Sequence, residues 1–297
     1  MRILVTGGCG FIGSNLVDML VANGHDVWVI DNLISGTEDN CNTGAQYIYE
    51  DVATALLKEE VQQTLQGVSV IFHLAAMPRI QPSFNDPLYT FQNNSTGTAV
   101  VCEFARAHGA KIVYSGSSTF YGGVYLNPYA FSKWVGEEIC KMYSQIYGLT
   151  TSIARFFNVY GPRHLKTGPY STVVGIFEDQ YSKGVALTIT GDGLQRRDFT
   201  HVNDICRGLI AMSKEDHLGA VFNLGSGTNY SINELAAMYE GAPVVYIPKR
   251  PGEAAETLAD TSAIHAAAGW VPLSNLSDYV TNFVAQVKKE KTYDTTN

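Results

Sequence analysis

The chain has 297 residues, 45% of them hydrophobic and 16% charged, a balance typical of a folded protein with a sizeable core. Its 28 acidic and 20 basic residues give a formal net charge of −8, which argues against a nucleic-acid-binding surface. Five widely spaced cysteines argue against disulfides or a zinc site, and no apolar run is long enough to span a membrane, so we expect a cytoplasmic protein without a metal site.

Short apolar runs alternate with helix-length amphipathic segments along the first half of the chain. We expect strands at residues 2–6, 26–30, 46–50, 68–74, 111–115 and 150–156, and helices at 12–23, 84–108 and 129–147. The strands are apolar without alternation, which is typical of a parallel sheet covered by helices on both faces. The expected fold class is therefore α/β with a doubly wound parallel sheet.

After about residue 156 the alternation loosens and Gly and Pro become frequent, as in GPRHLKTGPY and RPGEA. We expect residues 157–197 and 225–297 to form a smaller substrate-binding subdomain. Residues 198–224 again have the pattern of a helix followed by a strand. We expect this segment to return to the sheet of the first domain, residues 1–156.

The run TGGCGFIGSN lies between the first strand and the first helix and spaces Gly7, Gly10 and Gly13 as G-x-x-G-x-x-G. Such glycines allow a tight turn, a close approach of backbone to a pyrophosphate, and a helix N-terminus facing the phosphates. Asp31 ends the second strand, where a carboxylate accepts hydrogen bonds from the adenosine ribose and repels a 2′-phosphate. The sequence therefore predicts a Rossmann-type site for NAD rather than NADP, with a purely structural turn as the alternative.

Further cofactor contacts are expected where the other strands end. Asp51 and Val52 follow the third strand and could meet the adenine edge, and the small residues of HLAA, at 73–76, would let the backbone pass close to the cofactor. The residues expected at the cofactor from the loop and the strand ends are Gly7, Gly10, Phe11, Ile12, Gly13, Asp31, Asn32, Asp51, Val52, Leu74, Ala75, Ala76, Ser115 and Phe156.

Three tyrosines occur four residues apart in YGGVYLNPYAFSK, and Tyr129 is followed one helical turn later by Lys133. Asn127 and the proline after it predict a helix start, which places Tyr129 in the first turn. The Lys133 ammonium, the helix N-terminus and a nicotinamide cation would each lower the pKa of the Tyr129 phenol from its ordinary value of ~10. We therefore expect Tyr129, and not Tyr121 or Tyr125, to exchange protons; an aromatic stripe packed in a core is the alternative.

The run VYSGSSTFYG ends the fifth strand, at the edge where a parallel sheet presents residues to a ligand. A hydroxyl there can hydrogen-bond both the tyrosine oxygen and a substrate alcohol. Ser117 and Ser118 are the candidates, with an ordinary loop serine as the alternative for each.

Over nearly its whole length the chain resembles the extended short-chain dehydrogenase/reductase family, and within it the nucleotide-sugar epimerases of the UDP-glucose 4-epimerase type. The matching motifs occur in order and are TGGCGFIGS, DNL, HLAA, NSTGT, SGSSTFYG, PYAFSK, RFFNVYGPR, GDGLQRRDFTHVND, FNLGSG and RPGE. This resemblance implies a doubly wound NAD-binding sheet, a small C-terminal substrate domain and a UDP-sugar as the expected substrate.

The resemblance also implies a mechanism, in which NAD oxidises the sugar at C4 and reduces it again from the opposite face. Tyr129 would take the proton of the C4 hydroxyl, Ser117 would share the hydrogen bond, and Lys133 would hold the nicotinamide ribose. Residues 117–122 hold no carboxylate, where related dehydratases and decarboxylases carry one, so simple epimerisation is expected. The substrates would be UDP-glucose and UDP-galactose, or the N-acetylhexosamine pair.

Motif position within this family assigns several residues to the substrate. Asn158, Arg197 and Arg250 are expected at the nucleotide diphosphate, since the arginine fork matches phosphate oxygens. Glu253 is a further candidate at the substrate, and the resemblance also places Asn94, Tyr129 and Lys133 at the cofactor. Thr257 stands where glucose-restricted epimerases hold a bulky tyrosine, which suggests room for an N-acetyl group.

Two departures from the family pattern bear on the substrate. Only six residues, GVYLNP, separate Gly122 from Tyr129, so part of the usual pocket rim is absent and the pocket is expected to be more open. Arg79 replaces a small residue and could meet a diphosphate, meet a sugar carboxylate, or point outward.

The helices at 84–108 and 129–147 carry apolar residues on more than one face, and by the family resemblance we expect them to form a homodimer interface. The alternatives within the family are a UDP-uronate 4-epimerase or another NAD-dependent nucleotide-sugar oxidoreductase or dehydratase. The alternative from a different class is a non-catalytic nucleotide-binding protein.

Overall fold

The computed structural model describes the backbone of residues 1–294 and the side chains of residues 1–291. The strands are β1 (Arg2–Thr6), β2 (Asp26–Asp31), β3 (Gln46–Tyr49), β4 (Val68–His73), β5 (Lys111–Ser117), β6 (Thr151–Phe156), β7 (Val159–Tyr160), β8 (Leu187–Thr190), β9 (Arg196–Asp198), β10 (Thr200–His201), β11 (Leu218–Leu224), β12 (Asn229–Ser231) and β13 (Val244–Ile247). The helices are α1 (Phe11–Ala22), α2 (Val52–Ala55), α3 (Glu59–Thr64), α4 (Ile80–Asn85), α5 (Pro87–Phe91), α6 (Gly97–His108), α7 (Thr119–Gly122), α8 (Pro128–Tyr147), α9 (Val173–Lys183), α10 (Val202–Met212), α11 (Ile232–Ala237), α12 (Ser262–Ala268) and α13 (Leu276–Asp294), with a 3-10 turn η1 (Glu38–Asn40) and a π-helical turn η2 (Gln92–Thr96).

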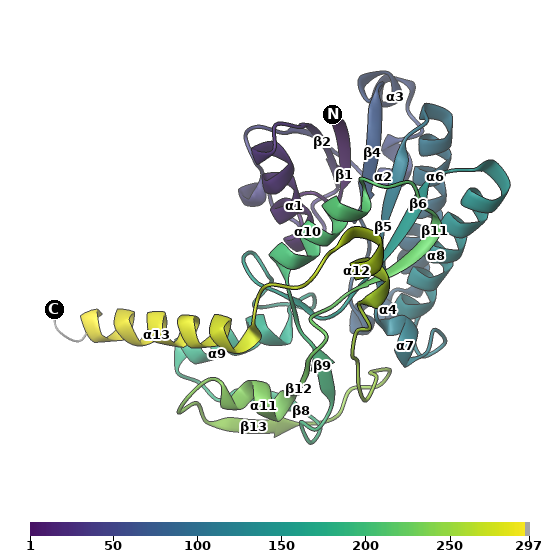
Figure 1. Ribbon diagram of the computed structural model, residues 1–297. Helices are drawn as coiled ribbons and strands as arrows, with labels where there is room; N and C mark the ends of the chain where they lie inside the picture. Colours follow the sequence, from purple (N-terminus) through teal and green to yellow (C-terminus); the bar gives the residue numbers. More distant parts are fainter. Residues whose placement is uncertain (295–297) are drawn as a thin grey trace.

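A seven-stranded sheet in the order β11-β6-β5-β4-β1-β2-β3 forms the upper part of the molecule in Figure 1. Every neighbouring pair is parallel. The chain winds outward from β1 in one direction through β2 and β3, and then in the other through β4, β5, β6 and β11. This is the doubly wound Rossmann order, so the expected fold class is confirmed.

Helices cover both faces of this sheet (Figure 1). Successive residues of β1 point to opposite faces, so Ile3 belongs to the core under α1, α10 and α12, whereas Leu4 belongs to the core under α6 and α8. Both side chains are at most 1% exposed. Burial on both faces explains why these strands are apolar without alternation.

The C-terminal part has a core of its own below the sheet. Phe177 of α9, Leu187 of β8, Leu235 of α11 and Val280 of α13 pack together there. One element departs from the expected division of the chain, because Ile264 of α12 packs in the core beside α10 and not in this lower core. β11 pairs with β6 at the edge of the main sheet.

The start of the helix expected at 84–108 is wrong: α4 is a separate helix, and α5, η2 and α6 then follow one another without a break from Pro87 to His108. Proline has no N–H and is tolerated only in the first turn of a helix, so a new helix must begin at Pro87. The Asp86 carboxylate caps that helix and accepts a hydrogen bond from the Tyr89 backbone N–H at 3.0 Å.

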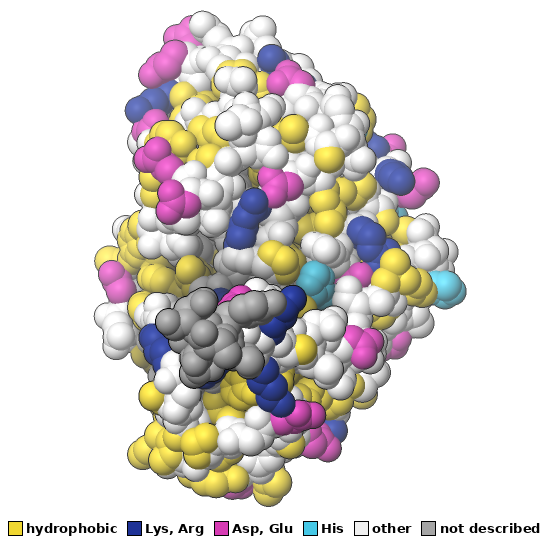
Figure 2. Space-filling model, turned by 90° about the vertical axis from the view of Figure 1, so that its left-hand side faces the viewer, with side chains coloured by type: hydrophobic (Ala, Val, Ile, Leu, Met, Phe, Trp, Pro, Cys, Tyr) yellow, Lys and Arg dark blue, Asp and Glu magenta, His cyan; other side chains and the backbone are white. Residues whose placement is uncertain are grey.

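The surface shows no gathering of one charge on the side that Figure 2 displays, where basic and acidic side chains are mixed among apolar ones. None of the helices in residues 1–294 is long and apolar enough to cross a lipid bilayer.

Asn127 is the N-cap of α8 and links it to the C-terminal part. Its Oδ1 accepts a hydrogen bond from the Ala130 N–H at 2.7 Å, and its Nδ2 donates to the Gly252 carbonyl at 3.1 Å. Asn127→Ala should lower the free energy of unfolding by about 1 kcal/mol in urea titrations. Asn127→Asp keeps a good cap, so its free energy of unfolding should fall by less than that of the alanine variant. An equal fall in both variants would show that the cap is not the stabilising contact.

Candidate active site

A cavity of about 1110 Å³ opens where the strands of the sheet end, and the C-terminal part forms its other wall. Ligands of doubly wound folds bind at this carboxyl edge. All cofactor- and substrate-binding residues expected from the sequence line this cavity, with the exception of Asn94.

Asn94 is the one expected site residue that the structure places elsewhere. It is 1% exposed, and its side chain accepts a hydrogen bond from the Met77 N–H at 2.7 Å and donates to the Met77 carbonyl at 3.1 Å and to Ser132 Oγ at 2.9 Å. Since these bonds use the amide group inside the protein, Asn94 supports the loop after β4 and does not face the cavity.

The glycine loop has the shape that a dinucleotide requires. Gly7 has a φ of 74°, and a Cβ on it would lie 2.8 Å from the Ala75 backbone nitrogen. A Cβ on Gly13 would lie 2.1 Å from the Gly7 carbonyl oxygen. Gly10 is the N-cap of α1 and supplies no side-chain cap, so the N–H groups of the first turn of α1 are available to a pyrophosphate.

Asp31 ends β2 beside this loop and is 7% exposed. Its carboxylate accepts hydrogen bonds from the Cys9 N–H at 2.9 Å and the Leu33 N–H at 2.8 Å, which fix its orientation. Each oxygen has a second lone pair, so the carboxylate can still accept ribose hydroxyls. Asn32 Nδ2 donates a hydrogen bond to Asp51 Oδ2 at 3.3 Å, and both residues line the cavity.

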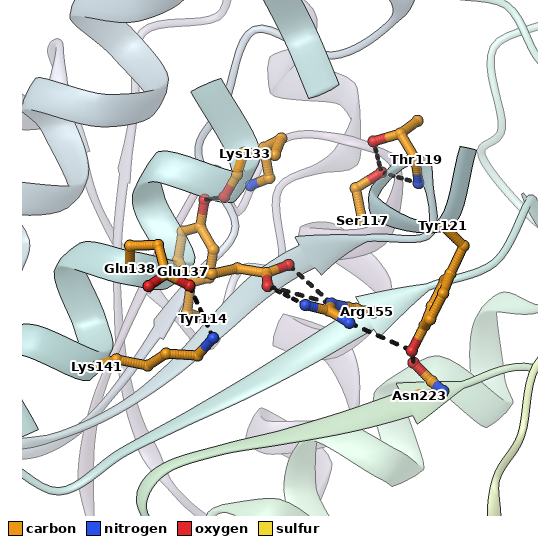
Figure 3. Close-up of polar contacts among 10 residues, drawn as sticks. All are labelled: Tyr114, Ser117, Thr119, Tyr121, Lys133, Glu137, Glu138, Lys141, Arg155 and Asn223. Atoms are coloured by element: carbon orange, nitrogen blue, oxygen red, sulfur yellow. Dashed lines mark hydrogen bonds and ion pairs between the residues drawn. The ribbon is translucent and has the colours of Figure 1, made fainter. Parts of the chain in front are cut away.

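Tyr129 lies in the first turn of α8, and its backbone N–H donates to Ser83 Oγ of α4 at 3.1 Å. The phenol hydrogen-bonds Ser117 at the end of β5. Ser117 Oγ also accepts hydrogen bonds from the Thr119 N–H at 3.2 Å and the Thr119 hydroxyl at 2.9 Å (Figure 3). Thr119 was not expected in the site, although it stands two residues after Ser117.

The expectation that the charge of Lys133 lowers the pKa of Tyr129 is not met in this structure. Burial raises the pKa of the Tyr129 phenol above its ordinary value, opposed by the Ser117 hydrogen bond and by the charge of Arg79. The cation that acts on the phenol is therefore Arg79, and desolvation outweighs it.

Lys133 is 3% exposed and lies beside the tyrosine. Its Nζ donates to Ser115 Oγ at 3.2 Å and lies 4.4 Å from the centre of the Tyr114 ring. Burial lowers the pKa of Lys133 to about 8, and the charge of Glu137 opposes this shift. The ammonium is thus held among neutral groups at the end of β5, on the floor of the cavity.

A buried ion pair connects α8 to the turn that follows Ser117 (Figure 3). Arg155 of β6 binds Glu137 of α8 through Nη2 at 2.6 Å and Nε at 3.1 Å, and the two side chains are 7% and 1% exposed. The guanidinium lies 3.4 Å from the centre of the Phe120 ring and donates to the Tyr121 hydroxyl at 3.2 Å. This pair was not expected from the sequence.

The opposite wall of the cavity holds the residues expected to bind the diphosphate. Arg197 lies 3.6 Å from Glu253, while Arg250 is exposed. Asn158 Nδ2 donates to Thr257 Oγ1 at 3.2 Å, so the Thr257 hydroxyl is already used inside the protein.

Arg79 lines the cavity, so of its three expected places the outward one is wrong. Its Nε donates to the Tyr170 carbonyl at 3.1 Å. Its φ of 81° lies in a region that residues other than glycine rarely adopt. Tyr170 was missed because it stands in a Gly- and Pro-rich run that has no regular pattern.

The other two tyrosines of the run lie outside the cavity. The Tyr121 hydroxyl donates to Asn223 Oδ1 at 2.9 Å, and Tyr125 is 81% exposed. The short connection between them packs against the segment after β13, where a Cβ on Gly122 would lie 2.8 Å from the Ala254 Cβ. Residues of the C-terminal part therefore lie directly against this connection.

Residues 3–225 match the model of the NAD dependent epimerase/dehydratase family. The chain belongs to this family. It is 32% identical over 315 residues to a UDP-glucose 4-epimerase of Mycolicibacterium smegmatis, an alignment that covers 96% of this chain and 97% of that one.

Two solved structures have the same fold over nearly the whole chain. A UDP-glucose 4-epimerase of Thermotoga maritima, solved with UDP-glucose, superposes with a TM-score of 0.90 at 30% identity and covers 98% of this chain and 99% of its own. A UDP-glucuronic acid 4-epimerase of Bacillus cereus, solved with UDP-glucuronic acid and NAD, superposes with a TM-score of 0.87 at 30% identity, with 97% and 99% covered.

Removing one member of the buried ion pair should destabilise the protein strongly. Arg155→Met leaves the Glu137 carboxylate without a counter-charge and should lower the free energy of unfolding by about 3–5 kcal/mol, measured by urea denaturation. The double variant Arg155→Met/Glu137→Leu removes both charges and should recover most of this loss. A double variant as unstable as the single one would show that packing of Arg155 on Phe120, and not charge, is what matters.

Proposed function

We propose that the protein is an NAD-dependent nucleotide-sugar 4-epimerase that acts through a transient 4-keto sugar. The observation that carries the proposal is the meeting of Tyr129, Ser117 and Lys133 in one cavity with the glycine loop. Residues 117–122 hold no carboxylate that could serve elimination. UDP-glucose and UDP-glucuronic acid are bound by the solved relatives, and a UDP-sugar is the substrate we propose here.

The structure has the features that NAD needs. Glycines stand where a Cβ would collide with the backbone of the loop or of Ala75, the N–H groups of the first turn of α1 are available to a pyrophosphate, and hydrogen bonds orient the Asp31 carboxylate beside the loop. NAD, when bound, supplies the acceptor for the C4 hydride and returns that hydride to the other face of the sugar.

The residues of the chain move the proton and orient the sugar. Tyr129 acts as the phenolate, a form that the positive charge of a bound nicotinamide would favour: it takes the proton of the C4 hydroxyl when the sugar is oxidised and returns a proton when the ketone is reduced. Ser117 holds the phenol and is itself held by Thr119. We assign Lys133 and Ser115 to the nicotinamide ribose, and Asn158, Arg197 and Arg250 to the nucleotide diphosphate.

The proposal is tested by incubating the purified protein with UDP-, dTDP- and GDP-sugars without added cofactor and following product stereochemistry by NMR. Inversion at C4 by retained NAD is expected. A reductase would instead consume added NADH stoichiometrically, and a non-catalytic nucleotide-binding protein would leave every sugar unchanged.

Tyr129→Phe removes the proton acceptor and should lower kcat by about 10²- to 10⁴-fold. Tyr125→Phe is the matched control, since Tyr125 belongs to the same run but is 81% exposed, and it should keep the wild-type rate. C4 inversion at an unchanged rate in Tyr129→Phe would refute the proposed mechanism.

We also propose that two copies pair through α5 and α8. Leu88 on α5 and Met142, Ile146 and Tyr147 on α8 are apolar and between 38% and 66% exposed. Exposed apolar side chains at both ends of α8 support a protein–protein interface along this helix. The division of the chain is a separate part of the proposal: residues 1–156 and 198–224 would form the NAD-binding part, and most of the remaining residues would form the substrate-binding part.

Light scattering at micromolar concentration should give the mass of a dimer. Ile146→Glu places a charge in the proposed interface and should shift the protein to monomers. Leu273→Glu is the control, because Leu273 is 73% exposed and its neighbour Ser274 bonds Asp204 of α10, on the other face of the sheet from α8. A wild-type monomer would contradict the proposed pairing.

A cytoplasmic location is the last part of the proposal. All five cysteines are free thiols, and four of them are buried. Free thiols are usual in reducing compartments.

A further inference from the structure

Arg79 is a cation of the cavity that no described side chain neutralises. To the described residues it makes a single hydrogen bond, from Nε to the Tyr170 carbonyl, so its two Nη groups keep their four N–H donors for a ligand. Within residues 1–291, no Asp or Glu carboxylate forms an ion pair with it. Burial lowers the pKa of the Arg79 guanidinium, which reflects the cost of holding this charge away from water.

Each of the other basic groups of the cavity has a carboxylate or water close to its charge. Arg197 is also desolvated, but Glu253 lies 3.6 Å away. Arg250 is exposed to water, and the charge of Glu137, one turn further along α8, acts on Lys133. Arg79 is partly buried, and holding a partly desolvated charge without an anionic partner is unfavourable, so the site around Arg79 favours a ligand that brings an anion to it.

The backbone fixes Arg79 at the reacting end of the cavity. Arg79 is the N-cap residue of α4, and four residues later Ser83 accepts the Tyr129 N–H at 3.1 Å. The charge of Arg79 acts on the Tyr129 phenol. The φ of 81° costs of order 1–3 kcal/mol, and such strain is typical of functional sites.

Resting on the proposed 4-epimerisation, we propose that Arg79 binds a carboxylate on the sugar, so that the substrate is a nucleotide-diphosphate hexuronate. Tyr129 handles the C4 hydroxyl, and the carbon next to C4 in the ring bears C6, which is the carboxylate carbon of a hexuronate. The guanidinium fork matches a carboxylate with two parallel N–H···O bonds. Arg197 and Arg250 are on the wall assigned to the diphosphate, so Arg79 is the cation left for the sugar.

A neutral hexose has a hydroxymethyl group in place of that carboxylate and would leave the guanidinium unpaired. A site built around a charged partner rejects an analogue that lacks it more strongly than an apolar pocket rejects a small change in size. Arg79 would therefore determine specificity, while Tyr129 performs the proton transfer on either kind of sugar.

The test compares kcat/KM for UDP-glucuronate and UDP-glucose, with products identified by NMR. The ratio of the two values does not depend on how much of the enzyme is active, so partial misfolding of a variant does not affect it. The wild-type protein should prefer UDP-glucuronate. Arg79→Gln should lower that preference by about 10- to 100-fold, the loss expected for charge-assisted hydrogen bonds. Arg79→Lys keeps the charge but lacks the planar fork, so its preference for UDP-glucuronate should lie between those of the wild type and Arg79→Gln.

Arg2→Gln is the matched control, because Arg2 lies at the start of β1, away from the cavity, and pairs with Asp26 at 2.7 Å. It should leave the preference unchanged. Binding of UDP alone, measured by calorimetry, should be the same in the wild type and in Arg79→Gln.

Three results would overturn the inference and leave the proposed function standing. They are a wild-type preference for UDP-glucose, an equal loss on both sugars in Arg79→Gln, and a loss of UDP affinity in that variant, which would place Arg79 at the diphosphate. A protein that inverts no nucleotide-sugar at C4 would instead overturn the proposed function. A pentose product with release of CO₂ would support carboxylate binding and refute 4-epimerisation.

Discussion

The buried ion pair between Glu137 and Arg155 is the contact that holds the catalytic elements in place. Glu137 lies one turn after Lys133 on α8, while Arg155 packs on Phe120 just after the strand end that carries Ser117. Neither charge can move into water without breaking the other's hydrogen bonds. The pair therefore couples the helix of Tyr129 and Lys133 to the turn that holds Ser117.

The ionisable groups of the cavity differ in how strongly burial favours their neutral forms, and this difference affects which ligands the cavity can bind. Burial lowers the pKa of Lys133 to about 8 and raises that of Tyr129, so both groups are poised toward their neutral forms by desolvation. Arg79 opposes this effect on the tyrosine. An anionic ligand at Arg79 would change the field on the phenol, which links substrate recognition to proton transfer in one small region.

The short connection before α8 changes which parts of the chain enclose the sugar end of the cavity. Asn127 caps α8 and at the same time holds the Gly252 carbonyl, and Gln81 of α4 donates to the Pro251 carbonyl at 3.1 Å. The segment after β13 thus lies against both α4 and the start of α8. A longer connection would occupy the space in which these contacts form.

The sequence by itself determined the doubly wound sheet, the glycine loop, the acid after β2 and which of three tyrosines lines the cavity. These features depend on apolar runs, turn residues and a helix cap, which act over a few neighbouring residues. Only the tertiary structure decided that Asn94 is turned inward, that Pro87 starts a new helix within one long apolar pattern, and that Arg79 rather than Lys133 acts on the Tyr129 phenol. Each of these depends on burial and on partners distant in the chain, such as Met77 for Asn94 and Tyr170 for Arg79, and no local pattern encodes them.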